Sequence, residues 1–182
     1  MVDETFPLTP AKLVSWRPGV EERLLNSPGI KGLVIRPGCV YGKQGGLTGI
    51  WFSGAYKDKS LKVIGDGHNF WSIVHVDDLA DGYLRAGESG LCGEVFNMVA
   101  YQTTVGQMVS AVALSSDYSG NIQFISLADA SKTMGDFAEC LALDQRVDGG
   151  KAKRLLGWQP KHHNFPDEID TYFASWKSFQ IS

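Results

Sequence analysis

Short apolar runs alternate along the chain with segments of helical periodicity. Five runs are short enough for strands, and glycine, proline or polar residues bound them. They cover residues 32–36, 61–64, 70–74, 94–98 and 122–125. The first run is continuous rather than alternating, which is typical of a strand covered on both faces of a sheet. Pro37 and Gly38 are expected to end it.

Between these runs, apolar residues recur at helical spacing. Helices are predicted after Pro18 as far as Leu25, over 47–57, after Asp77 and Asp78, after Thr104, over most of 127–143, from Asp148 to Leu156, and from Asn164 or Asp167 through Phe179. A polar loop is expected at 43–47, a glycine turn at 65–67, and a left-handed helix end at Gly157. Strands that alternate with helices indicate an α/β chain.

Composition narrows the class of protein. The chain has 182 residues and a formal net charge of -3, so no basic field favours nucleic acid or an anionic membrane. No apolar stretch is long enough for a membrane-spanning helix, and the acidic start argues against a signal or transit peptide. Cys39, Cys92 and Cys140 show no metal or disulfide spacing, so reduced, mostly buried thiols in a cytoplasmic protein are expected.

The sharpest local pattern is the strand that runs directly into Pro37 and Gly38. In doubly wound folds, ligands bind just beyond the carboxyl ends of strands, and glycine lets the backbone approach a ligand closely. The same residues could simply end the strand. The segment alone leaves both readings open.

A second pattern joins His75 to Asp77 and Asp78. The histidine could act as a base or a metal ligand, but a helix cap by the aspartates and a buried hydrogen bond from His75 are favoured. No further His or Cys stands at ligand spacing, so no metal site is predicted. His162 and His163 are expected in an exposed loop. Arg36, on a buried strand, needs an acidic partner, and a residue outside this chain is a candidate.

Four segments in this order resemble the extended short-chain dehydrogenase/reductase family, in its NAD-dependent epimerase/dehydratase branch. They are VIRPGCVYG, WSIVHVDDLADGY, GEVFNM and KAKRLLGWQP. The resemblance implies a partial Rossmann-type parallel sheet, made of the carboxy-terminal strands, with a small mixed α/β substrate lobe. Residues 1–182 would then form a single partial domain without the amino-terminal dinucleotide-binding half.

The same resemblance implies an atypical member. The family transfers protons with a Tyr and a Lys four residues later, but Leu13 and Arg17 occupy these places here. The glycine-rich cofactor fingerprint is not found, and no residue is assigned a catalytic role. NAD or NADP is the implied cofactor, with weak or no binding expected for the chain alone. Arg17, Pro37, Gly38 and Val40 would form what remains of its site.

By resemblance, Asn69, Phe70 and Trp71 would lie near the substrate entrance. Many members that use nucleotide sugars carry an Arg near this position, and none is found here. The implied activity is an NAD(P)-dependent oxidoreductase or epimerase acting on a small carbonyl or alcohol compound, sugar-related ones included, and inactive as the isolated chain. The alternatives are a non-catalytic module that pairs with a complete homologue through an exposed sheet edge, in a homo- or hetero-oligomer, or a truncated gene product.

Overall fold

The computed structural model describes residues 1–43 and 46–180, and the loop predicted at 43–47 therefore falls partly outside the described residues. The regular elements, in chain order, are η1 (Lys12–Val14), α1 (Arg17–Leu25), β1 (Leu33–Pro37), β2 (Cys39–Tyr41), η2 (Gly46–Thr48), α2 (Gly49–Tyr56), β3 (Lys62–Ile64), β4 (Phe70–His75), α3 (Val76–Glu88), β5 (Glu94–Met98), β6 (Tyr101–Thr104), α4 (Val105–Ser115), β7 (Gln123–Ile125), α5 (Leu127–Met134), α6 (Phe137–Ala142), α7 (Gly150–Leu156), η3 (Phe165–Glu168) and α8 (Ile169–Phe179). This order confirms the α/β class.

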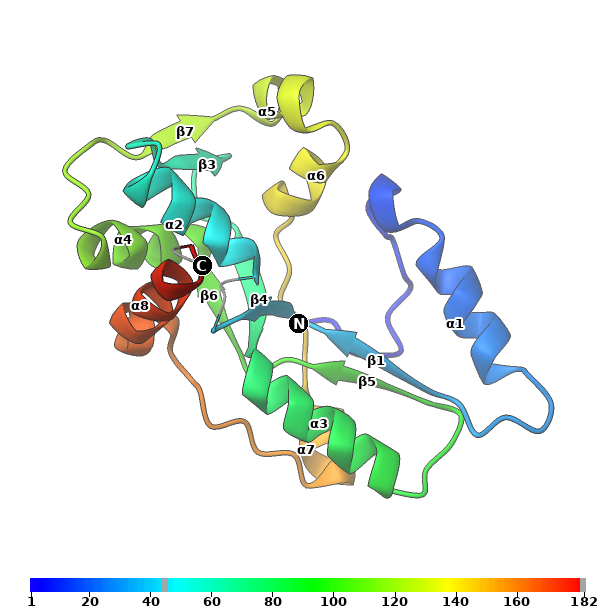
Figure 1. The fold of residues 1–182 in the computed structure, drawn as a ribbon. Coiled ribbons are helices and arrows are strands. Elements are labelled where there is room, and N and C mark those ends of the chain that lie inside the picture. Colours follow the sequence, from blue (N-terminus) through cyan, green and yellow to red (C-terminus); the bar gives the residue numbers. More distant parts are fainter. Residues whose placement is uncertain (44–45, 181–182) are drawn as a thin grey trace.

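The strands form three small sheets. β1 pairs in parallel with β5, β4 lies between parallel β2 and antiparallel β6, and β3 pairs in parallel with β7. α1 and α3 contact β1, and α7 contacts β5, whereas β3, β7, α5 and α6 lie at the other end of the molecule (Figure 1). The predicted parallel pairing is present, but it is divided among short sheets.

Two main apolar clusters hold these layers together, beside a smaller one between β3, α5 and α6. The larger one joins β4 to α2, α4 and α8 through buried aromatic residues such as Trp51, Phe52 and Trp176. The second packs α3 and α7 against β5 around Trp158, which is fully buried. These clusters fix the strand ends at which the candidate site residues lie.

Several details differ from the sequence prediction. The chain resumes strand structure at Cys39 directly after Pro37 and Gly38, and a further strand forms at Tyr101–Thr104. The helix expected over 127–143 is divided at Gly135, whose φ of 59° is left-handed and ends α5. β1 has helices on both faces, as predicted, because Leu33 and Ile35 pack toward α3 while Arg36 pairs with Glu21 of α1, although Val34 is its one buried residue.

The two outer edges of the β1–β5 pair differ in their hydrogen-bond partners. On the outer side of β5, the Glu4 carboxylate accepts a hydrogen bond from Asn97 N at 2.8 Å, and Lys151 Nζ donates to Val95 O at 2.8 Å. A parallel bridge between Val2 and Val147 continues this side. Among the described strands, β1 pairs with β5 alone.

Arg36 finds its acidic partner inside this chain. Its Nε and Nη2 atoms both donate to Glu21 Oε2, at 3.0 and 2.6 Å, and both side chains are largely buried. The suggestion of a partner outside the chain was therefore wrong. The pair fixes α1 against β1.

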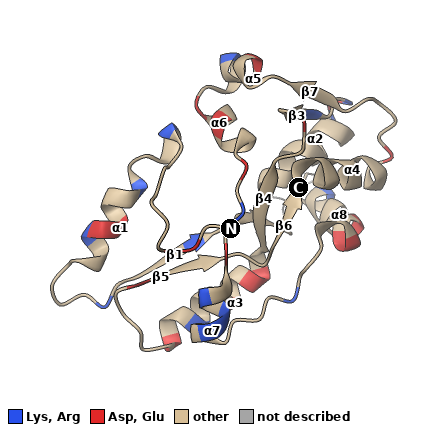
Figure 2. Cartoon of the chain, turned by 180° about the vertical axis from the view of Figure 1, so that it is seen from behind, with Lys and Arg blue, Asp and Glu red and all other residues tan. Residues whose placement is uncertain are grey.

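Charged residues and cysteines are distributed unevenly over the surface. Acidic and basic residues are mixed along α1, whereas α7 carries the basic residues Lys151, Lys153 and Arg154 (Figure 2). All three cysteines are free, but Cys92 is exposed rather than buried. None of the helices in the described part of the chain has the length and apolarity to cross a bilayer.

Candidate functional site

The residues predicted for the cofactor do not gather into one pocket. Pro37 ends β1 opposite Met98, and Val40 lies on β2 opposite Val74. Arg17 begins α1 and is exposed, with its guanidinium 5.6 Å from the centre of the Trp16 ring. Two hollows, one beside β3 and β7 and one along β6 and α4, are lined neither by these residues nor by Gly38.

Gly38 is held by the fold itself. Its N–H donates to Met98 O at 3.0 Å, which joins the ends of β1 and β5. A Cβ atom at this position would lie 2.5 Å from Ser72 O on the neighbouring strand β4. Close approach between two strands therefore explains this glycine without any ligand.

The three residues predicted near the substrate, Asn69, Phe70 and Trp71, make different contacts within the chain. Asn69 Nδ2 donates to Leu143 O at 3.0 Å and to Leu141 O at 3.4 Å, while its buried Oδ1 has no hydrogen-bond partner. The Phe70 ring lies under the Arg146 guanidinium at 3.8 Å. Trp71 is buried and stacks on Trp51, with ring centres 5.3 Å apart and planes inclined by 22°.

Trp71 also lines a cavity of about 340 Å³ that is partly enclosed. Its walls come from η2, α2, β3, β4, β7, α5 and α6 and from the first residue of α4, and include Ile64, Val105, Ala130 and Leu141. Of the residues that line it, Lys62 and Asp129 are charged. An apolar hollow of this size with a few polar groups at its rim is typical of a small-molecule site.

Sequence reasoning missed two of these contacts. The pattern places Trp51 on a helix without a role, because nothing in the spacing from 51 to 71 signals a stacked pair. The polar and basic residues around Arg146 favour a solvated surface for it. In the structure, however, the Arg146 guanidinium lies over the ring of Phe70, which is far away in the sequence. No local signal in the sequence indicates this contact.

A wider groove of about 1010 Å³ lies on another face, along β6 and α4. Its rim carries His68, Asp66 and His163, all of them exposed. Among the described residues, no three His, Cys, Asp or Glu side chains are placed to hold a metal ion. The groove is also more open than the cavity beside Trp71.

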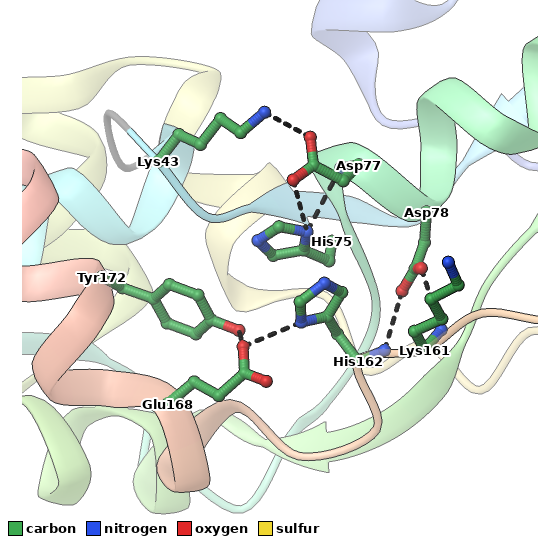
Figure 3. A network of polar contacts seen from close by, with 8 residues as sticks. All are labelled: Lys43, His75, Asp77, Asp78, Lys161, His162, Glu168 and Tyr172. Carbon is green, nitrogen blue, oxygen red and sulfur yellow. Dashed lines mark hydrogen bonds and ion pairs between the residues drawn. The ribbon is translucent and has the colours of Figure 1, made fainter.

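A polar network surrounds His75 at the start of α3 (Figure 3). The His75 ring, rather than either aspartate, caps this helix, because Nδ1 accepts a hydrogen bond from Asp77 N at 3.2 Å. The predicted cap by the aspartates was thus wrong, although a buried hydrogen bond to His75 is present. Asp78 instead accepts hydrogen bonds from the backbone N–H groups of Lys161 and His162.

The network ties the segment before α8 to α3. His162 stacks on His75 with ring centres 3.7 Å apart, and its Nδ1 lies 2.8 Å from Glu168 Oε2. Tyr172 donates to the same carboxylate. His162 is therefore half-buried and not part of an exposed pair, whereas His163 is exposed as predicted. The contacts favour a structural role, because His75 Nδ1, His162 Nδ1, Asp77, Asp78, Glu168 and Tyr172 each have a partner within the chain.

With this geometry in place, the chain can be compared with known proteins. Residues 22–98 match the NAD dependent epimerase/dehydratase family. The matched stretch runs from α1 through β5 and includes Pro37, Gly38, Trp71 and His75.

Individual relatives agree with this match. UDP-glucose 4-epimerase of Mycolicibacterium smegmatis is 27% identical over 134 residues, which are 70% of this chain and 40% of that protein. The solved structure of UDP-glucose 4-epimerase from Thermotoga maritima, with UDP-glucose, superposes with a TM-score of 0.76 at 24% identity, over 98% of this chain and 58% of that one. A dTDP-glucose 4,6-dehydratase from Streptomyces venezuelae, with NAD bound, gives 0.81 at 19% identity, over 97% and 54%.

These superpositions show that the chain has the fold of the corresponding part of these enzymes. The chain spans about half the length of the relatives it matches. Rossmann-type parallel pairing at β1 and β5 is consistent with this fold.

The histidine network predicts a pH-dependent stability. The pKa of His75 is lowered from its ordinary 6.5, first by burial and then by the charge of His162, while Asp77, Asp78 and Glu168 act in the opposite direction. Lys43, Tyr41 and Tyr172 complete its surroundings. Since the unfolded chain binds the proton more readily, the unfolding free energy is highest above pH 6.5 and falls as the pH drops below it, by at most about 1.4 kcal/mol per pH unit for one proton.

We expect His75→Asn to flatten this slope, because Asn can still cap the helix but does not titrate. The measurement is urea unfolding between pH 5 and 8. His163→Asn is the matched control, since that ring is exposed and should leave the slope unchanged. Equal slopes for the wild type and His75→Asn would contradict the assignment.

Proposed function

We propose that this chain is the substrate-side part of an NAD(P)-dependent oxidoreductase or epimerase of the matched family. Its substrate would be a small carbonyl or alcohol compound, whereas the similar solved structures hold UDP-glucose and UDP-glucuronic acid, whose sugars carry hydroxyl groups but are joined to a charged diphosphate. The observation that carries the proposal is the cavity beside Trp71, which lies within the shared fold and is the more enclosed of the two hollows described. In this view residues 1–182 form one partial domain.

The chain supplies little of a cofactor site by itself. Pro37 is exposed at the end of β1, Gly38 is packed against β4, and Arg17 makes no hydrogen bond or ion pair with either among the described residues. These groups do not fit a whole dinucleotide. NAD or NADP would need a second half that brings its own phosphate-binding turn.

No proton-transfer residue is assigned in this chain. Leu13, at the place of the family's tyrosine, has no proton to give and is half-exposed. Tyr41 is fully buried, and burial raises the pKa of its phenol well above the ordinary value. Turnover by the isolated chain is therefore not expected.

Calorimetric titration of NAD and NADP tests the proposal. We expect no saturable heat up to roughly millimolar cofactor for the chain alone, and saturable binding once a separately produced dinucleotide-binding half of a family member is added. Micromolar affinity of the chain alone for NAD or NADP would contradict the proposal that a second half is needed to bind the cofactor. No gain on adding the second half would overturn the substrate-side assignment.

A second candidate is a non-catalytic module that pairs with another chain. It is favoured by the edge of β1 that is unpaired among the described strands, and by exposed apolar residues on the amino-terminal segment and α1, namely Phe6, Leu13, Trp16 and Val20. Light scattering on the same samples separates the candidates. A stable dimer of this chain would favour pairing, and a monomer that gains mass only with the dinucleotide-binding half would favour the first proposal.

A further inference from the structure

The walls of the Trp71 cavity are largely apolar. Trp71, Ile64, Val105 and Ala130 are each buried, and Trp51 holds Trp71 in place by stacking. These side chains turn apolar surface to the cavity, from which a ligand would displace water. Burial of apolar ligand surface here would be favourable in proportion to its area.

The charges at the rim oppose a polyanion. Lys62 is the one cationic residue among those that line the cavity, and Asp129 faces the same space with the opposite sign. Asp129 is paired with Lys132 at 2.6 Å and bonded to Ser126, which holds its pKa below the ordinary value. A diphosphate placed here would meet Lys62 as its one cationic lining residue and would lie near the Asp129 carboxylate, whose partner Lys132 is already engaged, so its charge would be only partly compensated.

Other cations near β4 do not change this balance. Arg146 covers Phe70, and neighbouring side chains on a strand point to opposite faces. Since Trp71 lines the cavity, the Arg146 guanidinium lies on the other face of β4. Thr133 Oγ1, at the cavity wall, already donates to Ala130 O at 3.2 Å.

We propose that this cavity binds an uncharged, largely apolar ring compound that carries a single carbonyl or hydroxyl group, and that it does not bind a nucleoside diphosphate. This inference rests on the proposed function for the choice of site, and narrows its substrate class. The volume of about 340 Å³ suits one or two fused rings. The carbonyl or hydroxyl oxygen would be held at the rim, where Lys62 offers a donor.

The test uses 2-decalone as an uncharged fused-ring probe and UDP-glucose as the charged one. We expect calorimetry on the intact chain to give saturable binding of 2-decalone and affinity for UDP-glucose weaker by about tenfold or more. Equal or tighter binding of UDP-glucose, or no saturable binding of 2-decalone, would overturn the proposal. This outcome is independent of the cofactor titration, because no second half is added.

Variants locate the bound probe. Ala130→Leu fills the cavity and should weaken 2-decalone binding by about tenfold, whereas Ala128→Leu, on an exposed position of the same helix, should leave it within about twofold. Thr133→Trp covers the rim from an exposed position, and keeps the test valid if the buried variant folds poorly. Unchanged affinity in Thr133→Trp and in a folded Ala130→Leu would place the probe elsewhere and contradict the proposal.

Discussion

Replacing Trp158 by Ala should lower the unfolding free energy by about 3–5 kcal/mol, the usual cost of deleting a large buried aromatic side chain. The ring is fully buried between α3, α7 and β5, and its Nε1–H donates to Asp78 O at 2.8 Å. Because a domain of this kind is stable by only about 5–15 kcal/mol, the variant should be largely unfolded at moderate urea concentrations.

Urea unfolding followed by circular dichroism measures this change without relying on tryptophan emission. Trp16→Ala is the control, because that ring is 61% exposed and its removal should shift stability by less than about 0.5 kcal/mol. Similar losses for the two variants would mean that the cluster around Trp158 does not stabilise the fold.

Gly38→Ala should destabilise the chain by about 1–3 kcal/mol with no cofactor present, the range found for overpacked sites. The added Cβ would lie 2.5 Å from Ser72 O, a backbone atom of a strand paired on both sides, so no side-chain rotation can relieve the contact. The family resemblance points to a cofactor at Gly38, whereas this contact points to the fold.

Gly87→Ala provides the matched comparison. Gly87 lies in α3, and no atom lies within 4 Å of the position that the alanine methyl group would take, so alanine should be neutral or stabilise the helix by up to about 1 kcal/mol. The measurement is again the urea midpoint. If Gly38→Ala folds with wild-type stability, packing against β4 does not require the glycine, and a ligand-based role becomes the better explanation.

Local sequence signals predicted most of the regular elements. Apolar runs located β1, β3, β4, β5 and β7, and the glycine turn at 65–67 has the expected positive φ at Gly65 and Gly67. Gly157 likewise ends α7 in the left-handed conformation. These features depend on neighbours in sequence, and such neighbours are visible in the pattern.

The features that were missed depend on contacts between distant residues. Pro37 and Gly38 have the local pattern of a stop, but pairing with β4 lets the chain continue as β2. His162 has the local pattern of an exposed loop, because its partner, His75, lies far back along the chain. The stack of Trp51 on Trp71 and the cover of Phe70 by Arg146 are of the same kind. Periodicity carries no information about such pairs.

The outer edges of β5 and β1 differ, and this difference determines on which edge a further strand could pair. At β5, a carboxylate from Glu4 and an ammonium group from Lys151 already occupy the outward N–H of Asn97 and the outward carbonyl of Val95. Side chains satisfy these two groups without offering a new ladder, which disfavours the addition of a strand there. Among the described strands β1 keeps its second edge unpaired, so we expect a polypeptide that extends this sheet to lie beside β1, where the Glu21–Arg36 pair fixes α1.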